Sequence, residues 1–248
     1  MALATVTLDD KYALESGRVF LTGIQALVRL PIMQRQRDAA AGLNTAGFIS
    51  GFQGSPLNGV DQNLWRAEPF LVKHHIRFQP GLNEELGLTS VWGSQQVTLF
   101  EGARYDGVFA LWYGKWAGVG RCGDVFNHGN SAGSARHGGV LLVAGDDHMA
   151  RSSTVATQSE PMLTAAMIPV LSPAGVQDYL DLGIHGWAMS RYSGCWIGLK
   201  AIDETIESSA SVHVDPHRVT VRLAEDFVLP ADGLNIRLPD QPLQMERR

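Results

Sequence analysis

Apolar runs and polar, glycine-containing segments alternate along most of this 248-residue chain. The apolar runs that predict strands are Ala46–Ser50, His75–Phe78, Gly107–Tyr113, Gly139–Ala144, Pro169–Leu171 and Trp196–Lys200. Stretches with helical spacing or strong helix formers predict helices at Val60–Val72, Asn83–Leu99, Met162–Met167, Gly175–Met189 and Ala201–Ser211. Strands that alternate with helices are typical of an α/β fold, here a mainly parallel sheet with helices on both faces.

The two ends of the chain and one internal segment depart from this alternation. Residues 1–16 are polar and weakly patterned, which predicts an amino-terminal arm. Two helical patterns precede the first strand, at Arg18–Leu30 and Pro31–Leu43, and a glycine-rich irregular segment follows later at Trp116–Ser134. Near the end, Val212–Leu223 predicts a β-segment and Pro230–Arg248 a polar, proline-rich tail. We therefore expect an arm and helix at 1–41, an α/β domain at 42–213 and a β-segment with a tail at 214–248.

Composition narrows the class of protein. With 45% hydrophobic and 18% charged residues, the chain can bury a full core. The formal net charge of −5 and the scattered Lys and Arg residues leave no basic stripe for a phosphate backbone, so no nucleic-acid partner is expected. Cys122 and Cys195 form neither a disulfide framework nor a Cys-x-x-Cys motif, which favours a reducing, cytoplasmic setting. No signal peptide or membrane-spanning run is visible, so we expect no membrane association.

Four loops that follow predicted strands are rich in polar residues and glycine. They are Gly51–Asn58, Pro80–Glu85, Gly114–Asn130 and Gly145–Ser153. For any one of them, turn glycines and helix caps such as Asp146 or Ser152 are the simpler explanation. Purely structural loops in α/β proteins are usually short, however, and ligands bind at the carboxyl ends of parallel strands. The four loops therefore predict one functional edge of the sheet.

Several familiar sites do not fit these loops. The spacing of Gly51–Pro56 matches neither a dinucleotide fingerprint nor a phosphate-binding P-loop. Five candidate metal ligands occur without a metal-binding spacing, so no metal ligand is predicted among Asp124, His128, Asp146, Asp147 and His148. Lys115 and Arg121 are equally well explained as ligands for a substrate carboxylate and as exposed loop charges.

Ten segments of the chain carry a resemblance to a known family: LDDKY, ESGRVFLTG, ALVRLP, GFISGFQGSPLNGVDQ, HHIRFQPGLNEE, VWGSQQ, SARHGGVLLVAGDDH, SSTVATQSE, IPVLSPAGVQ and HGWAMSRYSGCWIGLK. The chain resembles the amino-terminal portion of the long bacterial indolepyruvate ferredoxin oxidoreductases. These belong to the thiamine-diphosphate-dependent 2-oxoacid:ferredoxin oxidoreductase superfamily. The resemblance implies that residues 42–213 form a pyrimidine-binding domain of an enzyme that oxidatively decarboxylates a 2-oxo acid to an acyl-CoA and reduces ferredoxin.

The resemblance also implies roles for individual residues. In the family, a glutamate after an asparagine hydrogen-bonds the aminopyrimidine ring of the cofactor, and Glu84 after Asn83 matches it. Gly54, Ser55, Asn83 and Glu84 are then the cofactor-binding residues, with Glu84 as the catalytic one. The substrate-binding residues are Ser55, Pro56, Lys115 and Arg121.

Helix geometry independently favours Glu84 over Glu85. If the helix begins near Asn83, Glu84 shares its face with Gly87, Leu88 and Val91, whereas Glu85 shares its face with Thr89, Trp92 and Gln96. The first face is the more apolar, and a dry environment favours the protonated, hydrogen-bonding form of an acid. The alternative is that both acids only stabilise the helix amino terminus.

The chain departs from the family in what it lacks. The diphosphate and magnesium half, the iron–sulfur cysteines and the carboxyl-terminal domain are missing from these residues, so the chain resembles a truncated or split product. Magnesium and iron–sulfur clusters are expected only on the missing part or a partner, and thiamine diphosphate only at a shared site. The expected partners are a diphosphate-binding domain or subunit, other subunits of a homo- or hetero-oligomer and, through the complete enzyme, ferredoxin.

We expect weak cofactor binding and no oxidation by the chain alone, and the identity of the 2-oxo acid stays open. The alternative function is a non-catalytic remnant that serves as a folding or interaction module.

Overall fold

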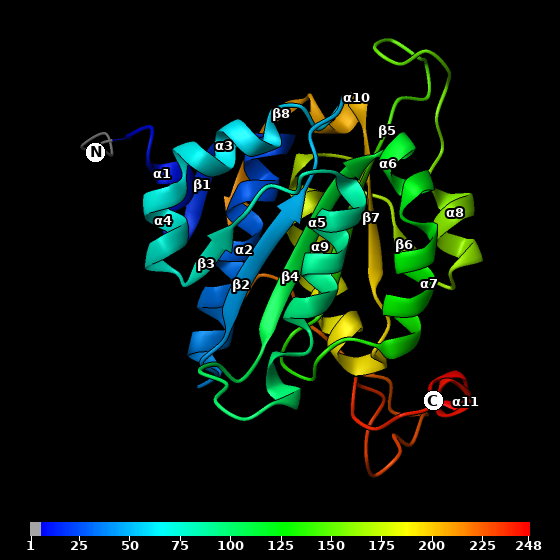
Figure 1. Ribbon diagram of the computed structural model, residues 1–248. Helices are drawn as coiled ribbons and strands as arrows, with labels where there is room; N and C mark the ends of the chain where they lie inside the picture. Colours follow the sequence, from blue (N-terminus) through cyan, green and yellow to red (C-terminus); the bar gives the residue numbers. More distant parts are fainter. Residues whose placement is uncertain (1–5) are drawn as a thin grey trace.

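A computed structural model describes residues 6–248 (Figure 1). Six parallel strands form the central sheet in the order β3-β2-β4-β5-β7-β6. Their bounds are β2 Ala46–Gly51, β3 Ile76–Phe78, β4 Val108–Lys115, β5 Val140–Asp146, β6 Val170–Leu171 and β7 Ile197–Ile202. The predicted α/β fold with a mainly parallel sheet is confirmed. β4 and β5 are almost wholly buried, which explains why their sequences are unbroken apolar runs.

Helices cover both faces of this sheet (Figure 1). One core cluster lies between the sheet and α2 Gly23–Ala40, α3 Val60–Arg66, α4 Glu68–Lys73 and α9 Val176–Ser193. The other lies against α5 Glu84–Ser94, α6 Trp116–Arg121, α7 Gly123–Ala132 and α8 Glu160–Ala165. The remaining short helices are α1 Asp10–Ala13, α10 Asp203–Ile206, α11 Pro242–Arg247 and the 3₁₀ turn Val97–Leu99.

The helix predicted over 18–30 is wrong in its first part. β1 Gly17–Thr22 is a strand that pairs antiparallel with β8 Ser209–Val214. Val19 and Leu21 are buried while Phe20 between them is exposed, which is the alternation of a strand. α2 then begins with a capping box, in which Thr22 and Gln25 bond each other's backbone N–H groups.

α2 belongs to the same folded unit as the sheet. Its residue Asp38 is buried and accepts two hydrogen bonds from Arg191 of α9, at 2.7 and 2.8 Å. Gln34 and Thr45 donate to the same carboxylate at 2.8 and 2.7 Å. α2, which precedes residue 42, thus contributes to the core and is tied to α9.

Three further predictions of secondary structure need correction. The segment 116–134, predicted as irregular, forms α6 and α7, because its glycines lie where helices pack closely: a Cβ at Gly129 would collide with the Trp196 ring. The helix predicted over 60–72 is interrupted at Ala67. The helix predicted over 201–211 keeps only α10, and the residues after it enter β8, where they pair with β1.

The order of the strands points to one edge as the place for a ligand. The chain runs from β2 outward to β3 and then returns to β4 on the other side of β2. Such a reversal leaves a crevice at the carboxyl ends of the two central strands, which is where ligands bind in open α/β sheets. These ends lie at the top of Figure 1. Separately, among residues 6–248 no helix is both long and apolar enough to cross a bilayer.

Candidate functional site

The loops after β2 and β4 meet at this reversal. Phe52 N–H donates to the Tyr113 carbonyl at 3.0 Å, which continues the pairing of the two strands into the loop. Gly54 then lies against the side chain of Lys115, since a Cβ at Gly54 would be 2.8 Å from Lys115 Cδ. The absence of a side chain at Gly54 therefore lets Lys115 cross the end of β2.

The amino terminus of α5 lies against the end of β2. Asn83 caps the helix through its side-chain oxygen, which accepts the Leu86 N–H at 2.8 Å. Gly81 N–H donates to the Gly51 carbonyl at 2.8 Å, and a Cβ at Gly87 would be 3.1 Å from Gly51 N. A glycine at both contact points allows this close approach and places the first residue of the helix, Glu84, at the carboxyl edge.

The Glu84 side chain is buried and incompletely paired. It is 6% exposed, whereas Glu85 points to solvent, as the helix geometry predicts. Its Oε2 atom accepts no hydrogen bond among the described residues, and Arg121 Nη1 lies 3.6 Å away. The Arg121 side chain is 71% exposed, so this ion pair is weak. A buried carboxylate oxygen without a hydrogen-bond donor is costly, so its presence needs an explanation, and a bound ligand that donates to it is one.

Two neighbours fix the position of Glu84. Trp112 Nε1 in β4 donates to the Glu84 backbone carbonyl at 3.0 Å. On the other side, a Cβ at Gly118 of α6 would lie 2.8 Å from Glu84 Cδ and Oε1. Burial, and after it the nearby Glu84 carboxylate, raises the pKa of the Cys122 thiol to about 12, so Cys122 stays neutral beside the site.

A second polar group forms around Lys115. Lys115 Nζ donates to Ser153 Oγ at 3.3 Å, and the hydroxyls of Ser55 and Ser152 share a hydrogen bond. Pro56 packs against the end of β5, since a Cβ at Gly145 would be 3.2 Å from Pro56 Cδ. Side chains from the loops after β2, β4 and β5 therefore converge.

The loop after β5 is folded around Asp147. The carboxylate of Asp147 accepts the backbone N–H groups of Arg151 and Ser152, each at 2.9 Å. The bond from Ser152 N–H is the main reason that the pKa of Asp147 lies below its usual range. Across the loop, Thr157 N–H donates to the Asp147 carbonyl at 3.1 Å and Asp147 N–H donates to Thr157 Oγ1 at 2.7 Å. This turn presents Ser152 and Ser153 to the site.

The predicted site residues fall into two neighbouring groups. Asn83, Glu84 and Arg121 form one, and Gly54, Ser55, Pro56 and Lys115 form the other. α6 begins directly after Lys115, and Gly118 and Arg121 lie on that helix, so α6 joins the two groups. Of the two groups, Arg121 contacts the first, through Glu84.

From the sequence, Ser152 is predicted at most as a helix cap, and Ser153 is not singled out. The available signal was a pair of hydroxyl residues in the polar loop after the most apolar strand.

The acids and histidines considered as metal ligands are engaged elsewhere. Asp146 accepts the Ser159 N–H and hydroxyl at 2.9 and 2.8 Å, and His148 Nδ1 bonds the Thr157 carbonyl at 2.8 Å. Asp124 and His128 form an exposed pair along α7 at 3.5 Å. Within the described part of the chain, no three His, Cys, Asp or Glu side chains converge to hold a metal ion.

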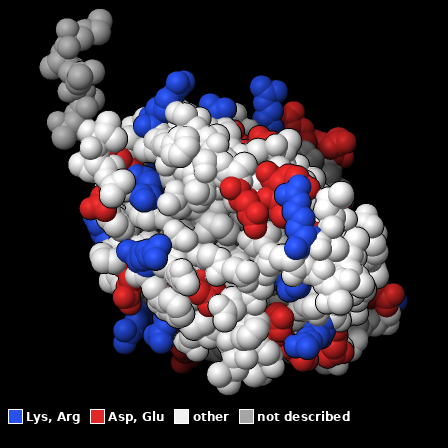
Figure 2. Space-filling view, turned by 90° about the horizontal axis from the view of Figure 1, so that it is seen from above, with Lys and Arg blue, Asp and Glu red and all other residues white. Residues whose placement is uncertain are grey.

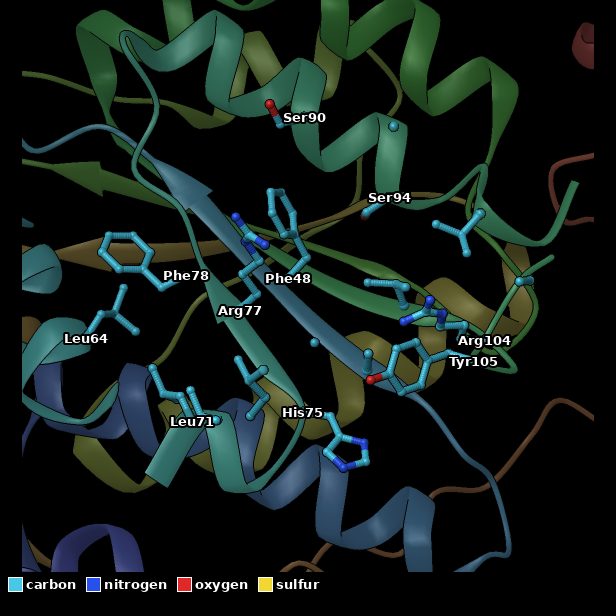
Figure 3. Close-up of a pocket in the computed structure, with 18 of the residues that line it drawn as sticks. Phe48, Leu64, Leu71, His75, Arg77, Phe78, Ser90, Ser94, Arg104 and Tyr105 are labelled. Carbon is cyan, nitrogen blue, oxygen red and sulfur yellow. The ribbon is translucent and has the colours of Figure 1, made fainter. Parts of the chain in front are cut away.

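A cavity of about 1080 Å³ lies elsewhere, along the edge strand β3. Figure 3 shows Arg77 and Phe48 on the side of the sheet that faces Ser90 of α5. None of the residues that line it is a predicted site residue. Viewed from above, the surface at the carboxyl ends has acidic and basic side chains side by side on its right part and a mainly uncharged area beside them (Figure 2).

Comparison with known proteins gives a likeness in structure. No family model and no curated protein matches the sequence. Among solved structures, the chain is similar to the 2-oxoglutarate:ferredoxin oxidoreductase from Magnetococcus marinus with 2-oxoglutarate, coenzyme A and succinyl-CoA bound, with a TM-score of 0.62 and 14% sequence identity. The match covers 82% of this chain and 33% of that enzyme, so the chain spans about a third of its length. The chain therefore shares the α/β fold of one portion of that enzyme.

Proposed function

We propose that this chain is the pyrimidine-binding part of a thiamine-diphosphate-dependent 2-oxoacid:ferredoxin oxidoreductase with an indolepyruvate-like substrate. The complete enzyme would oxidatively decarboxylate a 2-oxo acid to an acyl-CoA and pass the electrons to ferredoxin. The sequence motifs support the indolepyruvate assignment. The likeness in fold to the 2-oxoglutarate enzyme supports the wider family.

One observation carries the proposal: Glu84 has a buried carboxylate oxygen with no hydrogen-bond donor, at the edge of the sheet where ligands bind. This fits the cofactor, because a protonated ring nitrogen is the kind of donor that such an oxygen lacks. The apolar residues on the same helix face, Leu88 and Val91, are fully buried and keep water from the acid. An unpaired acceptor oxygen beside buried apolar side chains thus suits contact with an aminopyrimidine ring better than contact with bulk water.

In this assignment the chain contributes binding, orientation and proton handling. Bound thiamine diphosphate supplies the carbon nucleophile and the electron sink for the decarboxylation. Glu84 would hold a hydrogen bond to the pyrimidine ring and exchange a proton there, while Asn83 caps the helix that carries Glu84 and Gly54 would also contact the cofactor. Lys115 and the Ser55 hydroxyl bind the carboxylate of the 2-oxo acid next to Pro56. Arg121, beside Glu84, adds a positive charge to that of Lys115.

The remaining parts of such an enzyme lie outside this chain. Because the chain spans about a third of the length of the enzyme it resembles, we propose that a diphosphate-binding domain or subunit supplies magnesium and the iron–sulfur clusters. Ferredoxin would then interact with the complete enzyme.

Glu84→Gln tests the function, with Glu85→Gln as the matched control on the first turn of the same helix. In the enzyme assembled with its diphosphate-binding subunit, we expect Glu84→Gln to lower 2-oxo acid oxidation about 100-fold or more, because one positioned proton-transfer group typically contributes that much. Glu85→Gln should retain activity. Equal activity of the two variants would contradict the assigned role. Absence of any thiamine diphosphate binding by the assembled wild-type protein would favour the non-catalytic module.

A further inference from the structure

Asp203, which follows β7 directly, is a buried acid that the proposed reaction does not use. It is 3% exposed, and neither of its carboxylate oxygens accepts a hydrogen bond among the described residues. Arg151 Nη1 lies 3.4 Å from Asp203 Oδ2, and Arg151 Nη2 lies 3.5 Å from Glu204 Oε1. Within residues 6–248, Arg151 is the one cation that contacts the Asp203 carboxylate.

Arg151 belongs to the loop that reaches the candidate site. This loop rises above the carboxyl edge between β5 and α8 (Figure 1). The two residues after Arg151 point the other way: Ser152 bonds the Ser55 hydroxyl, and Ser153 accepts from Lys115 at 3.3 Å. The turn around Asp147 holds the backbone of Arg151 and Ser152, and the Ser152 hydroxyl also donates to Asp147 Oδ2 at 3.4 Å. The ion pairs of the Arg151 side chain with Asp203 and Glu204 join this part of the loop to α10.

We propose that Asp203 is a positioning residue, which acts through Arg151 to hold Ser152 and Ser153 against Ser55 and Lys115. In this position Ser152 and Ser153 bind the carboxylate of the ligand together with Ser55 and Lys115. The second half of this inference rests on the proposed function. The first half does not, because the anchoring of the loop is a property of the chain alone.

The electrostatics around Asp203 agree with this role. Burial, and after it the facing Glu204 carboxyl, raises the pKa of Asp203, while Arg151 acts in the opposite direction. Asp147 also faces this carboxyl and adds a further negative charge. A buried carboxylate close to other carboxylates is stabilised by a nearby cation. The Asp203 carboxylate therefore attracts the Arg151 side chain and so holds the loop that carries it.

Hydrogen exchange tests the anchor directly. In Asp203→Asn and in Arg151→Gln, we expect amides of 148–157 to exchange about fivefold faster, as for the loss of one partly exposed ion pair, with the rest of the chain unchanged. The double variant should exchange no faster than either single variant, because both changes remove the same contact. Arg151→Lys should restore most of the protection, and Glu207→Gln, an exposed acid that follows α10, should have no effect. Unchanged loop exchange in Asp203→Asn, or additive effects in the double variant, would overturn the anchor.

Ligand binding tests the second half, with pyruvate as the probe and the assembled enzyme as the protein. We expect Asp203→Asn to raise the Kd for pyruvate about threefold to tenfold with the affinity for thiamine diphosphate unchanged. An unchanged Kd for pyruvate, together with faster loop exchange, would show that the serines do not bind the ligand. If wild-type protein binds neither pyruvate nor thiamine diphosphate, the proposed function fails and the inference that the serines bind a carboxylate fails with it. The exchange result still decides the anchor.

Discussion

The backbone of Gly118 in α6 lies directly against the side chain of Glu84 in α5. A Cβ at Gly118 would come within 2.8 Å of the Glu84 carboxyl carbon and Oε1, which is closer than unbonded atoms approach. The place of this carboxyl is therefore set by a glycine more than thirty residues later in the chain. The same helix begins directly after Lys115 and carries Arg121, so small movements of α6 reach both groups of the candidate site.

Gly118→Ala should displace the Glu84 carboxyl, and Gly120→Ala is the matched control because a Cβ there meets no atom within 4 Å. In urea unfolding, we expect Gly118→Ala to lose about 1–3 kcal/mol through overpacking. Gly120→Ala should gain up to about 1 kcal/mol from helix propensity. Thiamine diphosphate affinity of the assembled enzyme should fall only in Gly118→Ala. Equal affinities would show that the carboxyl position tolerates this shift.

Asp38→Asn should weaken the attachment of α2 to α9. Asp38 accepts four side-chain hydrogen bonds in a buried position, two of them from Arg191. Removing one charge of a buried ion pair leaves the other uncompensated, so we expect a loss of about 3–5 kcal/mol in the free energy of unfolding. Asp124→Asn, whose side chain is 81% exposed, should change it by less than about 0.5 kcal/mol. A similar small change for both variants would mean that the Asp38 contacts contribute little.

The adjacent acids Asp146 and Asp147 should titrate on opposite sides of the usual Asp value of 3.8. Burial raises the pKa of Asp146, even though Ser159 bonds to it. The Ser152 N–H chiefly lowers the pKa of Asp147. Stabilisation from Asp147 is thus present above pH 3.8 and is lost as the pH falls through its lower folded-state pKa. For Asp146 the sign reverses, and stability decreases as the pH rises from 3.8 through its folded-state pKa.

Carbon-detected NMR of the side-chain carboxyl groups measures both values in one titration. We expect the Ser152 amide shift to follow the Asp147 transition, because the two groups are hydrogen-bonded. A common midpoint for the two acids would contradict these environments.

The alternation of apolar runs and helical patterns was enough to predict the sheet and most of the helices around it. Ala46–Ser50 lies within β2, and Gly107–Tyr113 and Gly139–Ala144 lie within β4 and β5 apart from their first glycine, because a strand buried on both faces must be apolar along its length. The cap of α5 at Asn83 and the burial of Glu84 were also predictable. Capping and helical periodicity are local properties, so neighbouring residues suffice to define them.

Contacts between distant residues decided the rest. The strand β1 has no local signal that outweighs its helical spacing, and it forms because β8, almost 190 residues later, offers it backbone partners. The glycines of α6 and α7 predict a loop when only the local sequence is considered. In the structure they lie in helices, because Glu84 and Trp196 occupy the space beside them. Ser152, Ser153 and Asp203 enter the site description only because three loops and α10 meet at one edge. The sequence by itself determined which elements form and which acid is buried, and the tertiary structure decided which side chains meet, because those contacts join residues that local patterns do not connect.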